Sequence, residues 1–205
     1  MTKPSSRIGI YAGTFNPVHT GHITFALQAM EAAKLDAVYY LPERQPWRPK
    51  QQVEHFAHRV AMLKQASLPH PQFHVMELDD VRFTVQRTLP KLQQHFQGSQ
   101  LVFLFGSDIV AGLPEWPYVE QLLQQSELVI GLRQQDDLKT IKKQIENWAV
   151  QPKVLSIFTS YAPHISSSSV RDALQRRTQT QGLLKSVQRY SDHHWLYVSL
   201  AESKS

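Results

Sequence analysis

Short apolar runs, rich in β-branched and aromatic residues, alternate along the chain with longer segments whose apolar residues recur every three or four positions. This alternation predicts strands separated by helices. We expect six strands, at residues 7–12, 37–41, 73–78, 101–105, 128–132 and 154–158. The first helix is expected at residues 20–34, where Ile23, Leu27 and Met30 fall on one face.

Helical spacing continues between and after the later strands. Further helices are expected at residues 54–66, 84–96, 118–125, 138–148, 168–176 and 186–197, the last being a C-terminal helical segment. Pro90 falls inside residues 84–96. It is expected to kink that helix or shift its start, because proline lacks the backbone N–H.

The order of these elements indicates one fold class. Strands that alternate with helices form a parallel sheet covered on both faces, and right-handed crossovers make that sheet doubly wound. We therefore expect a Rossmann-like α/β fold with a mostly parallel sheet. A length of 205 residues favours a single domain over residues 1–205.

Composition excludes several kinds of site. The chain has no cysteine, which rules out disulfides, thiolate metal sites and cysteine nucleophiles. The polar start of the chain is unlike a signal peptide, and no apolar run approaches the ~20 residues that span a bilayer. We expect a cytoplasmic protein without a membrane partner.

The chain is mildly basic, with a formal net charge of +5 and ten histidines. A basic excess suits an anionic partner such as a nucleotide, although scattered surface charge is the commoner explanation. Lysines and arginines do not form a stripe interleaved with aromatic residues, so a nucleic-acid partner is not expected. The oligomeric state stays open, a homo-oligomer included.

The first candidate site is the segment GTFNPVHTGH, residues 13–22, at the junction of the first strand and the first helix. Ligands of a parallel sheet bind at the carboxyl ends of its strands, where a helix N-terminus favours a phosphate. A single loop histidine is usually solvated or caps a helix. Two histidines three positions apart, His19 and His22, instead lie on one helix face and can address the same phosphate chain.

The second candidate site is the segment ISSSSVR, residues 165–171, which follows a strand and begins a helix. Serine hydroxyls and free N–H groups at a helix start form another anion site, which Arg171 can reach with a bidentate guanidinium. A serine run alone is more often a polar loop with a helix cap.

Taken together, the two segments resemble the signatures of the HxGH-type nucleotidyltransferases, the second of which reads Ile-Ser-Ser-Thr-x-Ile/Val-Arg. Within that superfamily the chain is most similar to the bacterial nicotinate-mononucleotide adenylyltransferase family, from about residue 7 to residue 197. Further matching stretches are Gly106-Ser107-Asp108 followed by Leu113 and Trp116, His58-Arg59-Val60 with Met62, and residues 128–133.

The resemblance implies that the phosphate of nicotinate mononucleotide attacks the α-phosphorus of ATP, giving a dinucleotide and pyrophosphate. It implies His19, His22 and Arg171 as catalytic residues. The implied ATP site comprises Gly13, Thr14, Phe15, Asn16, His19, Gly21, His22, Gly106, Asp108, Arg133, Ser167, Ser168 and Arg171. Mg²⁺ is expected between the phosphates, carried by the nucleotide and water, so no protein metal site is predicted. Asp108 is expected to contact a ribose or the metal, or equally to cap a helix.

The acceptor side matches the family less closely. Where the family has Pro-Pro-His-Lys, this chain has PWRPK at residues 46–50, and the stretch RFTVQRTL at residues 82–89 is one residue longer between its threonines. The implied acceptor residues are Arg48, Phe83, Thr84, Asp108 and Trp116. Backbone N–H groups of Thr84 and a neighbour are expected to bind the nicotinate carboxylate.

Two alternatives stay open. One is the same chemistry on another phosphomonoester, such as nicotinamide mononucleotide or phosphopantetheine. The other is a catalytically silent nucleotide-binding module on the same fold. Intact His19, His22 and Arg171 argue against the silent module, because binding alone does not require all three.

Overall fold

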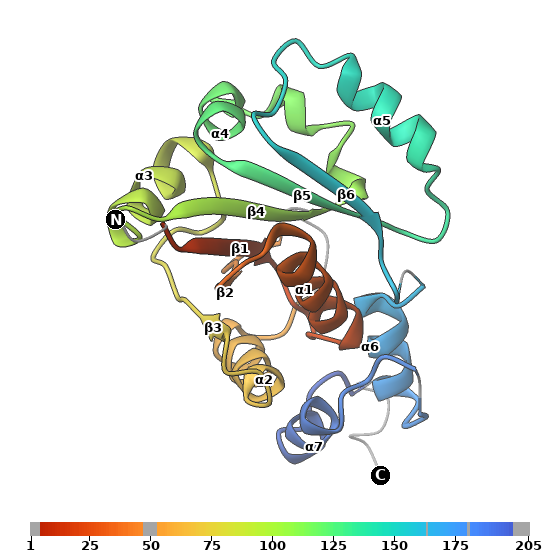
Figure 1. Cartoon of the computed structure of the whole chain (residues 1–205). Coiled ribbons are helices and arrows are strands. Elements are labelled where there is room, and N and C mark those ends of the chain that lie inside the picture. Colours follow the sequence, from red (N-terminus) through yellow and green to blue (C-terminus); the bar gives the residue numbers. More distant parts are fainter. Residues whose placement is uncertain (1–4, 47–52, 163, 180, 199–205) are drawn as a thin grey trace.

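Six parallel strands form one sheet at the centre of the computed structural model, which describes residues 5–46, 53–162, 164–179 and 181–198 (Figure 1). Each strand pairs in parallel with its neighbours, in the order β3-β2-β1-β4-β5-β6. The strands are β1 Arg7–Gly13, β2 Ala37–Pro42, β3 Phe73–Val75, β4 Gln100–Gly106, β5 Glu127–Leu132 and β6 Leu155–Thr159. This confirms the predicted doubly wound α/β fold.

The strand order reverses between β1 and β4. Successive strands move outward from β1 to β3, and the chain then returns to place β4 on the other side of β1. Ile10 of β1 lies opposite Tyr39 of β2 and Phe103 of β4. A reversal of this kind opens a crevice at the carboxyl ends of the two central strands, which is where ligands bind in such sheets.

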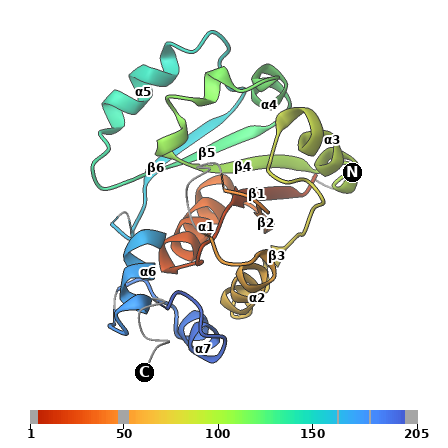
Figure 2. The same cartoon turned by 180° about the vertical axis from the view of Figure 1, so that it is seen from behind.

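Helices cover both faces of the sheet, as both views show (Figures 1 and 2). The helices are α1 Thr20–Ala33, α2 Phe56–Ser67, α3 Val85–His95, α4 Val119–Gln125, α5 Leu138–Glu146, α6 Ser167–Gln175 and α7 Lys185–His193. Helices α1 and α2 lie on one face and α3, α4 and α5 on the other, while α7 packs against α2.

Strand β4 explains why the sheet needs cover on both faces. Val102 and Leu104 join the core cluster that contains the buried residues of α1 and α2. Leu101, Phe103 and Phe105 join the cluster formed with α3, α4 and α5. Because side chains alternate along a strand, a continuous apolar run buries both of its faces.

All the predicted strands and helices are present, and several of their ends differ by one to four residues. Strand β3, at one edge of the sheet, ends at Val75 rather than at residue 78. Helix α3 begins at Val85, one residue after the predicted start, and continues through Pro90. Helix α7 ends at His193, before the predicted end at residue 197.

Within the residues that the structure describes, every helix is too short or too polar to span a membrane.

Candidate active site

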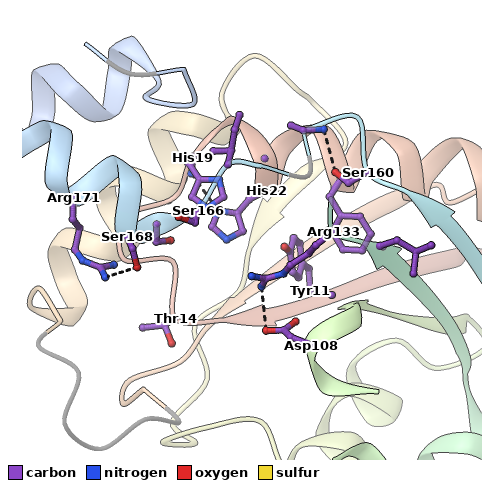
Figure 3. Close-up of a pocket in the computed structure, with 18 residues that line it drawn as sticks. Tyr11, Thr14, His19, His22, Asp108, Arg133, Ser160, Ser166, Ser168 and Arg171 are labelled. Atoms are coloured by element: carbon purple, nitrogen blue, oxygen red, sulfur yellow. Dashed lines mark hydrogen bonds and ion pairs between the residues drawn. The ribbon is translucent and has the colours of Figure 1, made fainter. Parts of the chain in front are cut away.

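A cavity of about 340 Å³ opens at the carboxyl ends of β1, β4, β5 and β6, where α1 and α6 begin (Figure 3). This is the crevice that the strand order predicts. Its lining residues are Tyr11, Thr14, His19, Gly21, His22, Phe25, Gly106, Asp108, Gly131, Leu132, Arg133, Ser160, Ala162, Ile165, Ser166, Ser167, Ser168 and Arg171. The cavity therefore brings together both of the candidate segments and the ends of two further strands.

The two histidines stack on each other at the start of α1. Their ring centroids are 3.7 Å apart with an interplanar angle of 27°. The backbone N–H of His19 donates to Nδ1 of His22 over 3.2 Å. Because Nδ1 of His22 accepts a hydrogen bond, the neutral ring carries its proton on Nε2 and has that N–H to offer to a ligand.

Small and aromatic neighbours hold this pair in place. A Cβ at Gly21 would lie 3.0 Å from Nδ1 of His19, so the close approach of that ring to α1 favours glycine. The ring of Phe15 meets His22 edge-on with centroids 5.1 Å apart, and Tyr11 lies on the same side at 6.0 Å. The imidazoles are thus fixed before any ligand binds.

Both imidazoles are neutral at pH 7. Burial, with the positive charge of Arg133 as a second cause, lowers the pKa of His19 to about 3. Burial also lowers the pKa of His22, with the charges of His19 and Arg133 adding to the effect. The pocket therefore presents two neutral imidazoles rather than two cations.

The serine-rich segment begins α6 on one side of the histidines in the view of Figure 3. Ser166 caps the helix and forms a capping box with Ser169. Nη2 of Arg171 donates to Oγ of Ser168 over 3.1 Å, and Ser167 donates to the carbonyl of Pro17 over 3.1 Å. A helix start, two serine hydroxyls and a guanidinium together form a site for an anion.

Arg171 also binds the first segment directly. Its Nη1 donates to the backbone carbonyl of Asn16 over 2.7 Å. With the bond from Ser167 to Pro17, this contact joins the loop after β1 to the start of α6. The two candidate segments, about 150 residues apart in sequence, are therefore one structural unit.

An ion pair between Arg133 and Asp108 lies on the other side of the histidines in the same view. Nη2 of Arg133 and Oδ2 of Asp108 are 3.1 Å apart, and each side chain is about half exposed. An exposed pair of this kind contributes at most about 1 kcal/mol, so a nucleotide can separate the two groups. A Cβ at Gly106 would lie 2.6 Å from Oδ1 of Asp108, so a larger residue there would displace that side chain.

The comparisons with known proteins fit this geometry. Residues 10–173 match the family model described as cytidylyltransferase-like. The chain belongs to this family.

Two curated relatives extend the likeness over nearly the whole chain. A protein of Coprothermobacter proteolyticus named "Probable nicotinate-nucleotide adenylyltransferase" is 33% identical over 203 residues, covering 96% of this chain and 99% of the relative. A protein of the same name from Neisseria meningitidis serogroup B is 29% identical over 197 residues, covering 93% and 98%. The expectation of a nucleotidyltransferase is thereby confirmed.

A solved structure shares the fold of this cytidylyltransferase-like chain. It is the Plasmodium falciparum nicotinic acid mononucleotide adenylyltransferase complexed with APC, with a TM-score of 0.74 and 17% sequence identity. The match covers 94% of this chain and 97% of that one. At this identity the likeness supports the fold alone.

Most residues predicted for the nucleotide line the cavity of this cytidylyltransferase-like chain. Gly13, Phe15 and Asn16 instead lie behind the lining. Phe15 is 2% exposed and supports His22, and Asn16 is 2% exposed and holds Arg171 through its carbonyl. The expectation that Asp108 caps a helix is wrong, because Gly106 is the N-cap of the short 3₁₀ helix Ser107–Ile109.

The lining also contains Tyr11, Phe25, Ser160 and Ala162, which no sequence motif singled out. Ile165, Ser166, Gly131 and Leu132 lie in motifs named above but were not assigned to the nucleotide. The rule that ligands sit at the carboxyl ends of strands would have identified Leu132 and Ser160, which end β5 and follow β6. Gly131 admits the ring of Phe25, since a Cβ there would lie 2.5 Å from Cε2 of that ring.

Arg59 is a further residue whose role the sequence patterns missed. It is fully buried, and its Nε donates to the carbonyl of Glu54 over 2.9 Å. Its Nη1 donates to the carbonyl of Thr14, and so fastens the loop after β1 to α2. One sign of this role is visible in the sequence: Arg59 stands beside Val60, on the apolar face of the predicted helix. An arginine buried on such a face requires hydrogen-bond partners.

Of the predicted acceptor residues, Asp108 lines the cavity, and Phe83 lies near Trp116. The rings of Phe83 and Trp116 lie 6.3 Å apart, with Phe83 buried and Trp116 half-buried. The N–H of Thr84, expected to bind a carboxylate, donates to Oγ1 of Thr88 over 3.0 Å, and the N–H of Phe83 donates to the carboxylate of Glu43 over 3.1 Å. Arg48 lies outside the described residues.

Proposed function

We propose that this chain transfers the adenylyl group of ATP to nicotinate mononucleotide, giving nicotinate adenine dinucleotide and pyrophosphate. The names of the relatives that match nearly the whole chain support this reaction. The observation that carries the proposal is the hydrogen bond from Arg171 to the carbonyl of Asn16, which makes one anion site of the two signature segments.

The reaction needs little side-chain chemistry. An oxygen of the acceptor's 5′-phosphate forms a bond to the α-phosphorus of ATP, and the bond from that phosphorus to the bridging oxygen of the β-phosphate breaks. The attacking phosphate is already ionised, so no general base is required. Catalysis then rests on alignment and on stabilising the charge that develops on the phosphates.

His19 and His22 supply N–H donors for that charge. Their neutral rings sit at the start of α1, where the helix N-terminus adds partial positive charge. Held by stacking and by Phe15, they need no rearrangement as the reaction proceeds. Thr14 and Gly21 complete this side of the cavity.

Ser167, Ser168 and Arg171 bind the β- and γ-phosphates that leave as pyrophosphate. This assignment follows from the start of α6, where free N–H groups, hydroxyls and a guanidinium face the cavity. On the opposite side, Arg133, Asp108 and Gly106 contact the nucleoside part of ATP, with Asp108 also within reach of the acceptor.

Mg²⁺ enters this account as part of the substrate MgATP. Among residues 5–46, 53–162, 164–179 and 181–198, no three histidine or acidic side chains are placed to hold a metal ion together. Asp108 is the one carboxylate in the described lining of the cavity, which suits a metal held mainly by phosphates and water. Bound there, Mg²⁺ would neutralise phosphate charge.

Acceptor recognition is assigned to Phe83, Thr84, Asp108, Trp116 and Arg48. The half-buried ring of Trp116, which packs near Phe83 and Phe105, is assigned to contact the pyridine. The N–H of Thr84 now bonds a neutral hydroxyl, and a substrate carboxylate is the stronger acceptor, so it can displace Thr88.

One observation favours nicotinamide mononucleotide as a second candidate acceptor. The buried carboxylate of Glu43 lies beside Phe83 and offers an acceptor to an amide NH₂. The two candidates share the same adenylyl-transfer chemistry and differ in the group that the pocket beside Phe83 recognises.

The test is a transfer assay. The protein is incubated with Mg²⁺ and ATP labelled in the α-phosphate, together with nicotinate mononucleotide, nicotinamide mononucleotide or phosphopantetheine. We expect label in a dinucleotide and stoichiometric release of pyrophosphate with nicotinate mononucleotide. Absence of transfer to every acceptor would support the silent nucleotide-binding module instead.

A further inference from the structure

The chain turns back into the core after its last helix. Leu196 and Tyr197 are each 7% exposed, although they lie near the end of the chain. Trp195 and Tyr197 both adopt left-handed backbone, with φ of 54° and 61°. Residues with side chains rarely adopt this conformation, and such outliers concentrate where a side chain must be aimed at a particular place.

The turn is fixed to α7 by two hydrogen bonds. The N–H of Leu196 donates to the carbonyl of Ser191 over 3.0 Å, and Oγ of Ser191 donates to the carbonyl of Leu196 over 3.2 Å. Ser191 is 1% exposed, so both bonds are shielded from water. Helix α7 therefore determines where the side chain of Tyr197 points.

Tyr197 reaches the loop that follows β1. Its hydroxyl donates to Oδ1 of Asn16 over 3.0 Å, in a buried contact between residues 181 positions apart. Its backbone N–H donates to Oε1 of Glu54 over 3.0 Å, and the N–H of Glu54 donates to the same Oδ1 of Asn16 over 3.1 Å. These three bonds form a closed ring of Tyr197, Asn16 and Glu54.

The phenol is suited to this contact. Burial, with the charge of Glu54 as a second cause, raises the pKa of Tyr197, while Arg171 and Arg59 oppose the shift. The hydroxyl therefore keeps its proton and donates. Both arginines act electrostatically on the phenol because it lies close to the loop that they hold.

Asn16 connects this ring to the phosphate site. Its side chain is held by Tyr197 and Glu54, and its backbone carbonyl accepts the 2.7 Å bond from Arg171. A shift of the whole residue Asn16 would move the backbone carbonyl that orients the guanidinium of Arg171. The C-terminal turn thus determines the geometry of Arg171 through a single intermediate residue.

We propose that Tyr197 is a positioning residue for the nucleotide: its hydroxyl fixes Asn16 and, through it, Arg171 against the leaving phosphates. This role rests on the proposed function, because it assigns Arg171 to the β- and γ-phosphates. Tyr197 itself lies behind the cavity lining and touches no reacting atom.

The first test is Tyr197→Phe, which deletes the hydroxyl and leaves the ring. Asn16 keeps its bond from Glu54, so the fold should survive with a melting temperature close to that of the wild type. Affinity for a non-reactive α,β-methylene analogue of MgATP, measured by calorimetry, should fall about 5-fold, the scale for one neutral hydrogen bond. The matched control is Tyr190→Phe, which removes a hydroxyl on α7 that contacts His58 and should leave affinity unchanged.

The second test is a double-mutant cycle with Arg171→Lys. If Tyr197 acts through Arg171, Tyr197→Phe should have little further effect on analogue binding once Arg171 is replaced. Full additivity would overturn the proposed route, as would wild-type affinity in Tyr197→Phe or an equal loss in Tyr190→Phe.

The design separates this inference from the proposed function. Analogue binding requires no acceptor, so a wild-type chain that binds the analogue but fails to adenylylate nicotinate mononucleotide leaves the role of Tyr197 standing. A wild-type chain that does not bind the analogue would overturn both.

Discussion

The guanidinium of Arg171 donates a 2.7 Å hydrogen bond to the backbone carbonyl of Asn16, 155 residues earlier in the chain. The same guanidinium binds Oγ of Ser168. A planar fork satisfies two acceptors in fixed directions and still presents N–H groups to a ligand. Because of this contact, we expect even a conservative replacement of Arg171 to change nucleotide binding.

Arg171→Lys keeps the positive charge and loses the fork. We expect KM for MgATP to rise by roughly 10-fold, on the scale of one charge-assisted hydrogen bond, with KM for the acceptor within about 2-fold. Steady-state kinetics with each substrate varied in turn measures both constants. Arg176→Lys, at the exposed C-terminal end of the same helix, is the control. A defect confined to the acceptor would place Arg171 in the wrong half of the site.

His22→Ala tests one of the two imidazoles assigned to the phosphates. The replacement removes an N–H aimed into the cavity, so we expect kcat to fall by roughly 10²–10³, the scale for losing one preorganised donor to developing charge. Affinity for MgATP should change much less. Single-turnover and equilibrium binding measurements separate the two effects, with His95→Ala, an exposed residue at the end of α3, as the control. Turnover within a few-fold of wild type would remove His22 from the mechanism.

His19 makes stability depend on pH. Its pKa in the folded chain is about 3, below the ordinary 6.5, so between these values the unfolded chain binds a proton that the folded chain does not. The contribution of His19 to the free energy of unfolding is therefore fully present above pH 6.5 and is lost as the pH falls. Between pH 7.5 and pH 5.5 the free energy of unfolding of the wild type should fall by about 1.4 kcal/mol more than that of His19→Gln. Urea unfolding at both pH values measures this, and identical losses would show that His19 is not held neutral.

Gly131→Ala tests the packing behind the nucleotide. The added Cβ would lie 2.5 Å from the buried ring of Phe25, so either the ring or β5 must move. Overpacking of this kind costs about 1–3 kcal/mol in the free energy of unfolding. Gly112→Ala is the matched control, since the nearest atom to its Cβ is 4.0 Å away. Equal melting temperatures for the two variants would show that the ring has room to give way.

The fold followed from the sequence because period and length separate strands from helices. Leu101–Phe105 reads as a strand, and β4 extends it by one residue at each end, since a continuous apolar run fits a strand buried on both faces. The length of strand β3 was overestimated. Its residues past Val75 have pairing on one side alone, and a local sequence pattern does not reveal how a strand is paired.

The site was predictable only in part. Residues within a motif, such as His19 and His22, carry their spacing in the sequence, and the sheet rule places them at a crevice. Contacts between distant segments carry no such signal. The sequence order does not indicate that Tyr197 bonds Asn16, or that Glu43 takes the N–H of Phe83, because both depend on how loops fold over the sheet edge.

The most direct measurement of the central claim compares nicotinate and nicotinamide mononucleotides side by side, each at limiting concentration with saturating MgATP. The account predicts pyrophosphate release with both or with the acid alone, and a kcat/KM at least about 10²-fold higher for the acid, on the scale for sites built around hydrogen bonds. Equal efficiency, a preference for the amide, or no pyrophosphate release with either mononucleotide would contradict it.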